Sequence, residues 1–235
     1  DAGRLGDAGD GIEILSRVLW MRGISRIDAM VISHADVDHY NLVPDLLKRF
    51  TVKSFYTSPQ SNQLPAAFRN IRTAASRQGI DWREIDEGAL LQRGDCRVEI
   101  LHPPKTKAGD GAADYGTDNA NSIVLRIDYR GHTILLPGDI ESEGLERLMR
   151  EHQIDADVVM APHHGSPNSS PNRFADWCTP KWIVISSGNR KSLADHQSIA
   201  ERQQCKILHT AVHGATEAVV DRCGLQVTTF LPSPP

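Results

Sequence analysis

The residues best suited to chemistry lie in one short stretch, residues 33–39, which read Ser-His-Ala-Asp-Val-Asp-His. This stretch follows the apolar run 29–32, which is typical of a short buried strand. Neutral histidine and ionised aspartate both bind divalent cations, and carboxylate oxygens favour harder ions than thiolates do. The ordered pattern His34-x-Asp36-x-Asp38-His39 therefore predicts a metal site at the end of a strand. The competing interpretation is a polar loop that begins a helix and binds no metal.

This pattern resembles the first metal motif of the metallo-β-lactamase fold, which usually reads His-x-His-x-Asp-His. Asp36 stands where that motif has its second histidine, and this replacement is similar to the soluble hydrolase domain of the bacterial DNA-uptake protein ComEC. Two later stretches support the resemblance, Leu-Pro-Gly-Asp at 136–139 and His-His-Gly-Ser at 163–166. Their order and spacing match that family along nearly the whole chain.

The resemblance implies an α/β fold, the four-layer αββα sandwich, with the site where loops at strand ends meet. It places His34 and Asp36 on one metal position, and Asp38 and His39 on the other. Asp139 would bridge or support both positions. His163 would complete the second position with His164 close by, and the sequence leaves open which of these two histidines is the ligand.

The chain departs from the family at residues 117–122, which read Thr-Asp-Asn-Ala-Asn-Ser where most members carry a further histidine. The first metal position then has fewer nitrogen ligands and should prefer harder ions. We therefore expect one or two divalent ions, manganese or zinc. Asn119 and Asn121 are expected to contact substrate instead.

The expected chemistry is hydrolysis, because two neighbouring cations lower the pKa of a bridging water and clamp a phosphoryl oxygen. Asp38 would orient the water, and His164 or His196 would protonate the leaving oxygen. A histidine on a helix surface is the equally supported alternative for His196. Ser166 is a further candidate for substrate binding, as are two cations on a long loop, Lys105 and Lys107, which would hold phosphates without reading bases.

The composition is that of an ordinary globular protein: of the 235 residues, 40% are hydrophobic and 24% are charged. The formal net charge of −4 offers no overall basic field to attract a nucleic acid. The four cysteines form no Cys-x-x-Cys pair, which argues against a thiolate zinc site. No apolar run approaches the roughly 20 residues that span a bilayer.

Hydrophobic periodicity predicts alternating helices and strands in one domain. The opening Asp-x-Gly is similar to a motif that follows the first hairpin of the family, so we expect residues 1–235 to lack the first strands of the fold. Helices are expected at 12–22, 42–50, 64–78, 142–152, 172–178 and 194–203. Strands are expected at 52–56, 90–101 with a break at Gly94-Asp95, 156–161, 182–186, 206–208 and 219–231. Residues 122–136 are expected to form a two-stranded hairpin that turns at 129–132, and a long loop at 103–121 is expected to cover the site.

The leading functional prediction is a metal-dependent phosphodiesterase or nuclease that acts on DNA during DNA uptake. The resemblance implies attachment to a membrane channel domain that these residues do not include, on the extracytoplasmic side of the bacterial inner membrane. One alternative is a hydrolase of small phosphodiesters, phosphorylcholine esters or lactones, because the same metal core serves all of these substrates. The other alternative is a non-catalytic, metal-stabilised domain of a transporter.

Overall fold

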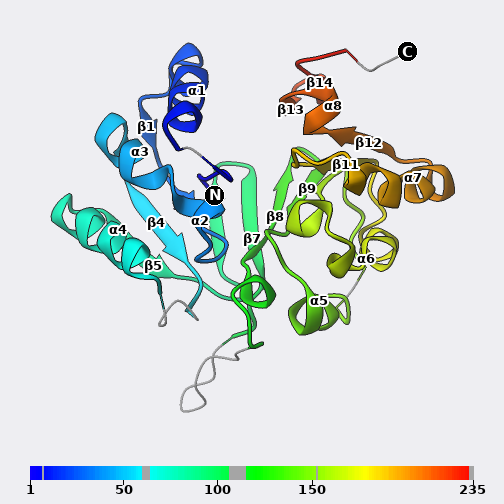
Figure 1. Cartoon of the computed structure of the whole chain (residues 1–235), viewed down its shortest axis with the longest axis horizontal. Coiled ribbons are helices and arrows are strands. Elements are labelled where there is room, and N and C mark those ends of the chain that lie inside the picture. Colours follow the sequence, from blue (N-terminus) through cyan, green and yellow to red (C-terminus); the bar gives the residue numbers. More distant parts are fainter. Residues whose placement is uncertain (7, 60–63, 106–114, 152, 233–235) are drawn as a thin grey trace. The chain divides into compact units, whose positions relative to one another are not determined.

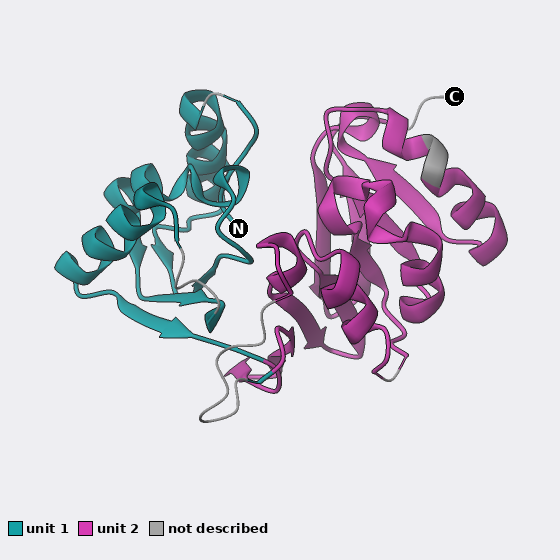
Figure 2. Cartoon of the chain, turned by 60° about the horizontal axis from the view of Figure 1, so that its bottom comes forward, with its two compact units in different colours: residues 1–86, 105–114 teal, residues 87–104, 115–235 magenta. Residues whose placement is uncertain are grey.

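The computed structural model describes residues 1–235 except residues 7, 60–63, 106–114, 152 and 233–235 (Figure 1). The chain divides into two units, each with its own sheets and core (Figure 2). Unit 1 contains residues 1–86 and 105–114, and unit 2 contains residues 87–104 and 115–235. That these residues make one domain without the first strands of its fold stays a prediction.

Unit 1 combines short parallel strands with helices. Its sheets are a three-stranded one in the order β2-β4-β5 and the pair β1-β3. The strands are β1 (Arg26–Ile27), β2 (Met30–Val31), β3 (Thr51–Val52), β4 (Ser54–Thr57) and β5 (Asp81–Glu84). The helices are α1 (Ala8–Met21), α2 (Val37–Tyr40), α3 (Val43–Arg49) and α4 (Ala66–Arg77).

Aromatic residues form the centre of the unit 1 core. Phe55 on β4 is fully buried, and its ring stacks on Trp82 of β5 with 4.3 Å between the ring centroids. Phe68 of α4 meets the Trp82 ring edge-on at 5.9 Å. Phe68, Ile71 and Ala75 lie on the buried face of α4 because their spacing follows the helical period.

The predicted strand 52–56 is two strands in the structure, so this expectation is wrong in detail. Lys53 separates β3 from β4, and the two belong to different sheets. The Lys53 N–H donates to Ile27 O across the β1-β3 pair, whereas its carbonyl accepts from Asp81 N beside β5. The change of partner at one residue moves the chain from one sheet to the other, and hydrophobic periodicity does not record it.

Unit 2 contains a seven-stranded sheet in the order β12-β11-β10-β9-β8-β7-β6 and a separate hairpin, β13-β14. The sheet strands are β6 (Leu90–Arg93), β7 (Cys96–His102), β8 (Val124–Tyr129), β9 (His132–Leu136), β10 (Val158–Met160), β11 (Trp182–Ile185) and β12 (Lys206–His209). The hairpin strands are β13 (Thr216–Asp221) and β14 (Gly224–Thr229), and the helices are α5 (Ser142–Leu148), α6 (Pro171–Cys178), α7 (Lys191–Gln203) and α8 (Thr210–His213).

The β8-β9 hairpin follows directly from its turn residues. Tyr129 pairs with His132, which leaves Arg130 and Gly131 as a two-residue loop, and both have positive φ (51° and 79°). Positive φ at both central residues is the geometry that matches the right-handed twist of the flanking strands. The predicted hairpin is therefore confirmed.

Parallel pairing brings three strand ends of unit 2 to one edge of its sheet. β9, β10, β11 and β12 pair in parallel, so the segments that follow β9, β10 and β11 leave from the same edge. Those segments carry Asp139, His163 and Ser187. Loops at the carboxyl ends of parallel strands are a common position for binding residues.

Most of the remaining elements match the expectations with shifted ends, but β5, α2 and α8 were not expected. The helix expected at 142–152 ends at Leu148, and the helix expected at 194–203 already begins at Lys191. Part of the expected 103–121 loop is ordered as a short 3-10 turn, η2 (Asn119–Asn121). None of the helices in the described ranges is both long and apolar enough to cross a membrane. The α/β class expected from the sequence is confirmed.

Candidate metal-binding clusters

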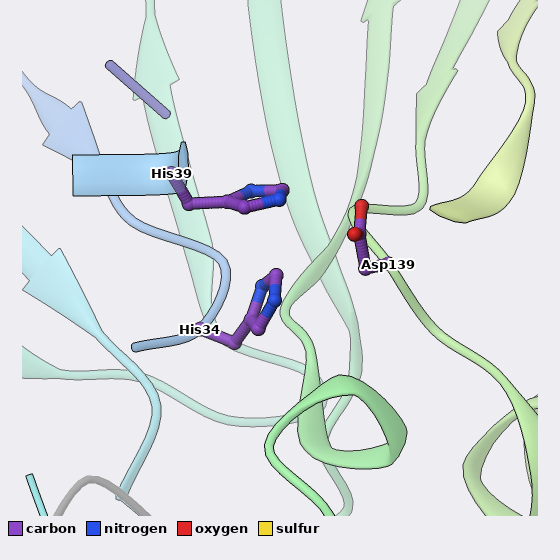
Figure 3. Close-up of side chains that lie close together, drawn as sticks. All are labelled: His34, His39 and Asp139. Atoms are coloured by element: carbon purple, nitrogen blue, oxygen red, sulfur yellow. The ribbon is translucent and has the colours of Figure 1, made fainter. Parts of the chain in front are cut away.

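The predicted metal motif of unit 1 is formed by the segment between β2 and the end of α2. We call His34, Asp36, Asp38 and His39 cluster 1. His34 and His39 are 6% and 5% exposed, and their rings lie next to one another with 4.1 Å between centroids (Figure 3). Asp36 is half exposed at its side chain and begins α2. The short helix turns the chain back so that residues five apart in sequence face one another.

Asp1 orients His39. Its carboxylate accepts hydrogen bonds from Ser33 N at 2.6 Å and from Ser33 Oγ at 2.9 Å, and it lies 3.0 Å from His39 Nδ1. A carboxylate can only accept, so His39 Nδ1 carries the proton and Nε2 carries the lone pair. A carboxylate on the rear nitrogen is the usual support of a metal-binding histidine.

Ser33 fixes the second ring of cluster 1. Its hydroxyl proton is donated to Asp1, so the Oγ can only accept from His34 Nδ1, which lies 3.0 Å away. The lone pair of His34 is therefore on Nε2. This atom is buried and makes no hydrogen bond within the described part of the chain, and an Asp36 carboxylate oxygen lies 3.5 Å from it. A buried imidazole nitrogen with a lone pair and a carboxylate beside it fits a cation.

Gly3 brings the opening segment onto this loop. A Cβ at Gly3 would lie 2.2 Å from the Asp38 carbonyl oxygen, so only glycine permits the approach. Ala2 N donates to His39 O and Leu42 N donates to Ala2 O, which pins residues 1–3 beside α2. The Asp-x-Gly motif was recognised from the sequence as a family feature, but its support of His39 was not anticipated.

Unit 2 contains a second group, cluster 2, formed by Asp139, His163 and His164. Asp139 follows β9 and is 5% exposed, and it is labelled in Figure 3. The histidines lie in η3 (Pro162–Gly165) after β10. The His163 N–H donates to Gly138 O, and the Nε2 atoms of His163 and His164 lie 3.9 Å and 3.5 Å from an Asp139 carboxylate oxygen.

Both rings of cluster 2 are held by their rear nitrogens. His163 Nδ1 lies 2.9 Å from Glu141 Oε2, and His164 Nδ1 donates to Ser186 O at 2.9 Å. Each partner is an acceptor, so each Nδ1 carries the proton and each Nε2 presents a lone pair on the side of Asp139. The choice between the two histidines stays open, because both have the tautomer that a ligand needs. Glu141 was not anticipated from the sequence.

The backbone of cluster 2 is strained. His163 and His164 have φ of 47° and 54°, and Gly165 follows with φ of 80°. Left-handed conformations are unusual for side chains other than glycine, and they cluster at functional sites. A Cβ at Gly165 would approach Ile185 Cγ2 to 2.9 Å, so the turn also depends on this glycine.

Two residues expected near the substrate have contacts within their own unit. Asn121 is buried, and its amide donates to Thr117 O and accepts from Tyr115 N. Asn119 donates its amide to Glu141 Oε1 at 3.3 Å. Both side chains therefore support local structure, and their predicted contact with substrate stays a prediction.

The other predicted residues lie in varied environments. Ser166 caps the next turn by accepting from Asn168 N, and Lys105 is exposed. Lys107 lies outside the described residues. His196 is 2% exposed on α7, donates Nδ1–H to Ser192 O, and packs near Gly165. The alternative that His196 is a surface histidine is wrong, because its face of α7 packs against the rest of unit 2. The proposed role of His196 as a proton donor stays a prediction.

Comparison with known proteins gives a family and a fold. A sequence model of the beta-lactamase superfamily domain matches residues 7–226. The chain is 30% identical to ComE operon protein 3 of Bacillus subtilis over 96% of its own length, and 26% identical to competence protein ComA of Neisseria gonorrhoeae over 87%. It spans 28% and 27% of those proteins, less than a third of each.

Solved structures agree on the fold. The metallo-β-lactamase fold protein YhfI of Bacillus subtilis is similar with a TM-score of 0.56 at 13% identity, over 88% of this chain and 82% of YhfI. Zinc-bound PqqB of Methylobacterium extorquens is similar with a TM-score of 0.51 at 12% identity, over 78% of this chain and 71% of PqqB. The metallo-β-lactamase fold expected from the motifs is therefore confirmed.

Proposed function

Because the chain belongs to the beta-lactamase superfamily and has the metallo-β-lactamase fold of its hydrolases, we propose that it is a metal-dependent phosphodiesterase that cleaves DNA during DNA uptake. The observation that carries the proposal is the state of four imidazoles. His34, His39, His163 and His164 each have Nδ1 held by an oxygen, so that Nε2 carries the lone pair that a metal ion could bind. In each cluster, two histidines oriented in this way have carboxylates beside them, which are donors that suit divalent cations.

The proposed ligand sets follow the family pattern. His34 and Asp36 would hold one ion, Asp38 and His39 the other, with Asp139 supporting both. His163 would complete the second set with His164 beside it. Bound divalent ions supply Lewis-acid chemistry, which lowers the pKa of a water and neutralises the charge that develops on a phosphoryl oxygen.

The chain's own residues would orient the reacting groups and supply a proton. Asp38, half-buried in α2, would orient the attacking water. Asp1 and Ser33 hold the His39 and His34 rings, which would keep both Nε2 atoms in position to bind a metal ion. To give a proton to the leaving oxygen, His164 or His196 would have to carry a second proton on Nε2, because Nδ1 of each already donates to a backbone carbonyl. His164 could take this role only where His163 is the metal ligand.

The substrate is proposed to be DNA because one of the two relatives is named a competence protein and because the proposed ligand set suits phosphodiesters. We also propose that the chain works beside a membrane channel domain on the extracytoplasmic side of the inner membrane. Manganese is proposed to serve better than zinc, because Asp36 makes the first set richer in oxygen. One observation favours a second candidate, a small phosphodiester or lactone: the net charge of −4 does not attract a polyanion.

A panel of substrates tests the proposal. Purified protein, with its metal content measured, is incubated with manganese or zinc and with single-stranded DNA, bis(p-nitrophenyl) phosphate or a lactone. Turnover of DNA that Asp139→Ala lacks supports the nuclease. Turnover of only the small ester or lactone replaces it with the second candidate, and stoichiometric metal without any turnover favours a non-catalytic, metal-stabilised domain.

A further inference from the structure

A chain of side-chain contacts in unit 2 connects Asn119, Glu141 and His163. The Asn119 amide donates to Glu141 Oε1 at 3.3 Å, and the other carboxylate oxygen, Oε2, lies 2.9 Å from His163 Nδ1. The far nitrogen of the same ring, Nε2, lies 3.9 Å from the Asp139 carboxylate. Both oxygens of Glu141 thus have partners, and the Glu141 side chain is only 15% exposed.

The packing of α5 on η2 holds this chain together. A Cβ at Gly144 would lie 1.9 Å from Ala120 O, so α5 reaches η2 only because residue 144 is glycine. Asn119 and Ala120 are adjacent in η2, and Glu141 immediately precedes α5. The same close approach therefore brings the Asn119 amide to the Glu141 carboxylate.

The His163 and His164 rings differ in what holds their rear nitrogens. In other respects they are alike, since their side chains are 30% and 34% exposed and both lie in the same strained turn. The rear nitrogen of His164 is bonded to a main-chain carbonyl, whereas that of His163 depends on a carboxylate. Such a carboxylate fixes the tautomer and raises the basicity of the ligating nitrogen.

We propose that Glu141 is a positioning residue that fixes His163 as an Nε2 metal ligand, and that Asn119 holds Glu141 in place rather than contacting substrate. The inference rests on the metal binding in the proposed function, but not on the identity of the substrate. The quantity that tests the role of Glu141 is the affinity of the metal-free protein for manganese, measured without any substrate.

The experiment compares four variants with the unaltered chain. Glu141→Ala removes the support, Glu141→Gln keeps an acceptor oxygen without the charge, and Asn119→Ala releases the far end of Glu141. Glu143→Ala is the matched control, because Glu143 is exposed in the first turn of the same helix. Manganese affinity is measured by competition with a chelating dye, the tautomer of His163 by nitrogen NMR of the metal-free protein, and thermal stability on the same samples.

We expect Glu141→Ala to weaken manganese binding by roughly 10–100-fold, the usual effect of losing an outer carboxylate. Glu141→Gln and Asn119→Ala should fall between this variant and the unaltered chain, and Glu143→Ala should bind like the unaltered chain. Glu141→Ala should also lose the single Nδ1–H tautomer of His163 while the midpoint of thermal unfolding stays the same.

Three results would overturn the inference. The first is a manganese affinity of Glu141→Ala within about twofold of the control, and the second is a loss of affinity that only follows a lower thermal midpoint. The third is absence of manganese binding by the unaltered chain. Failure of the nuclease proposal can be told apart from failure of the Glu141 inference. In that case DNA would stay intact while the differences in manganese affinity among these variants persist.

Discussion

The carboxylate of Asp1 lies 3.0 Å from Nδ1 of His39, 38 residues later in the chain. This contact determines the tautomer of a histidine that the sequence predicts to be a metal ligand, and Ser33 extends the same effect to His34. The binding atoms of cluster 1 are therefore prepared by residues outside the metal motif.

Replacing Asp1 tests this preparation. Asp1→Ala should weaken manganese binding by roughly 10–100-fold, because the His39 ring loses the acceptor that fixes Nδ1–H. Asp1→Asn should lose less, since its amide oxygen still accepts one hydrogen bond. Titration of the metal-free proteins with manganese measures these affinities. The control is Asp10→Ala, which changes an exposed residue in the first turn of α1. Equal affinities in Asp1→Ala and Asp10→Ala would contradict the role of Asp1.

Asp36 should determine which metal supports activity. Asp36→His restores the nitrogen ligand found in most of the superfamily, so the ratio of manganese-supported to zinc-supported rate should fall. The measurement is the initial rate of phosphodiester hydrolysis with each ion at saturation, for both chains. A higher rate with zinc in the unaltered protein would show that the argument from ligand hardness is wrong.

The close approach of α5 to η2 makes a prediction about stability. Gly144→Ala places a Cβ against Ala120 O, so it should lower the free energy of unfolding by about 1–3 kcal/mol, the usual cost of overpacking. Gly188→Ala is the matched control, since no heavy atom lies within 4 Å of a Cβ there. Urea denaturation of both variants measures the difference. Similar unfolding midpoints for the two would argue against a tight α5–η2 contact.

His102 should make stability depend on pH. It is 1% exposed at the end of β7, and burial lowers its pKa to about 4, although the hydrogen bond from Nδ1 to Ser122 O acts in the opposite direction. The unfolded chain, with a histidine pKa near 6.5, binds the proton first. The stability contributed by neutral His102 is therefore complete above about pH 6.5 and is lost as the pH falls toward 4.

The measurement is the unfolding free energy of metal-free protein between pH 7 and 4, for the unaltered chain and for His102→Gln. The difference between the two should shrink as pH falls, by at most about 1.4 kcal/mol per pH unit. A constant difference across this range would mean that His102 does not titrate between the two states.

The candidate ligands could be named from the sequence because their signal is local. His34 to His39 form one motif, and Asp139 and the histidine pair each follow an apolar strand. The supporting carboxylates were not predicted, because Asp1 and Glu141 reach their histidines across 38 and 22 residues. No spacing rule links such pairs before the chain is folded.

The difference between local signals and contacts over long sequence distances also explains which fold predictions were wrong. The β8-β9 hairpin was predicted because two adjacent residues determine its turn. The division of 52–56 into two strands was missed, because it depends on which strands lie on either side of Lys53. The burial of His196 likewise depends on how α7 packs, and the pattern of α7 alone does not contain that information.

Metal-dependent cleavage of DNA is measured most directly as the rate at which a single-stranded oligonucleotide is cut. The unaltered chain with manganese should cleave it with little sequence preference and more slowly as salt rises. The logarithm of its binding constant for the strand should fall with the logarithm of salt concentration by about 0.7 per phosphate contact. Asp139→Ala, with the same manganese, should leave the oligonucleotide intact. Equal rates for the two proteins, or no cleavage by a chain that holds its manganese, would contradict the proposal.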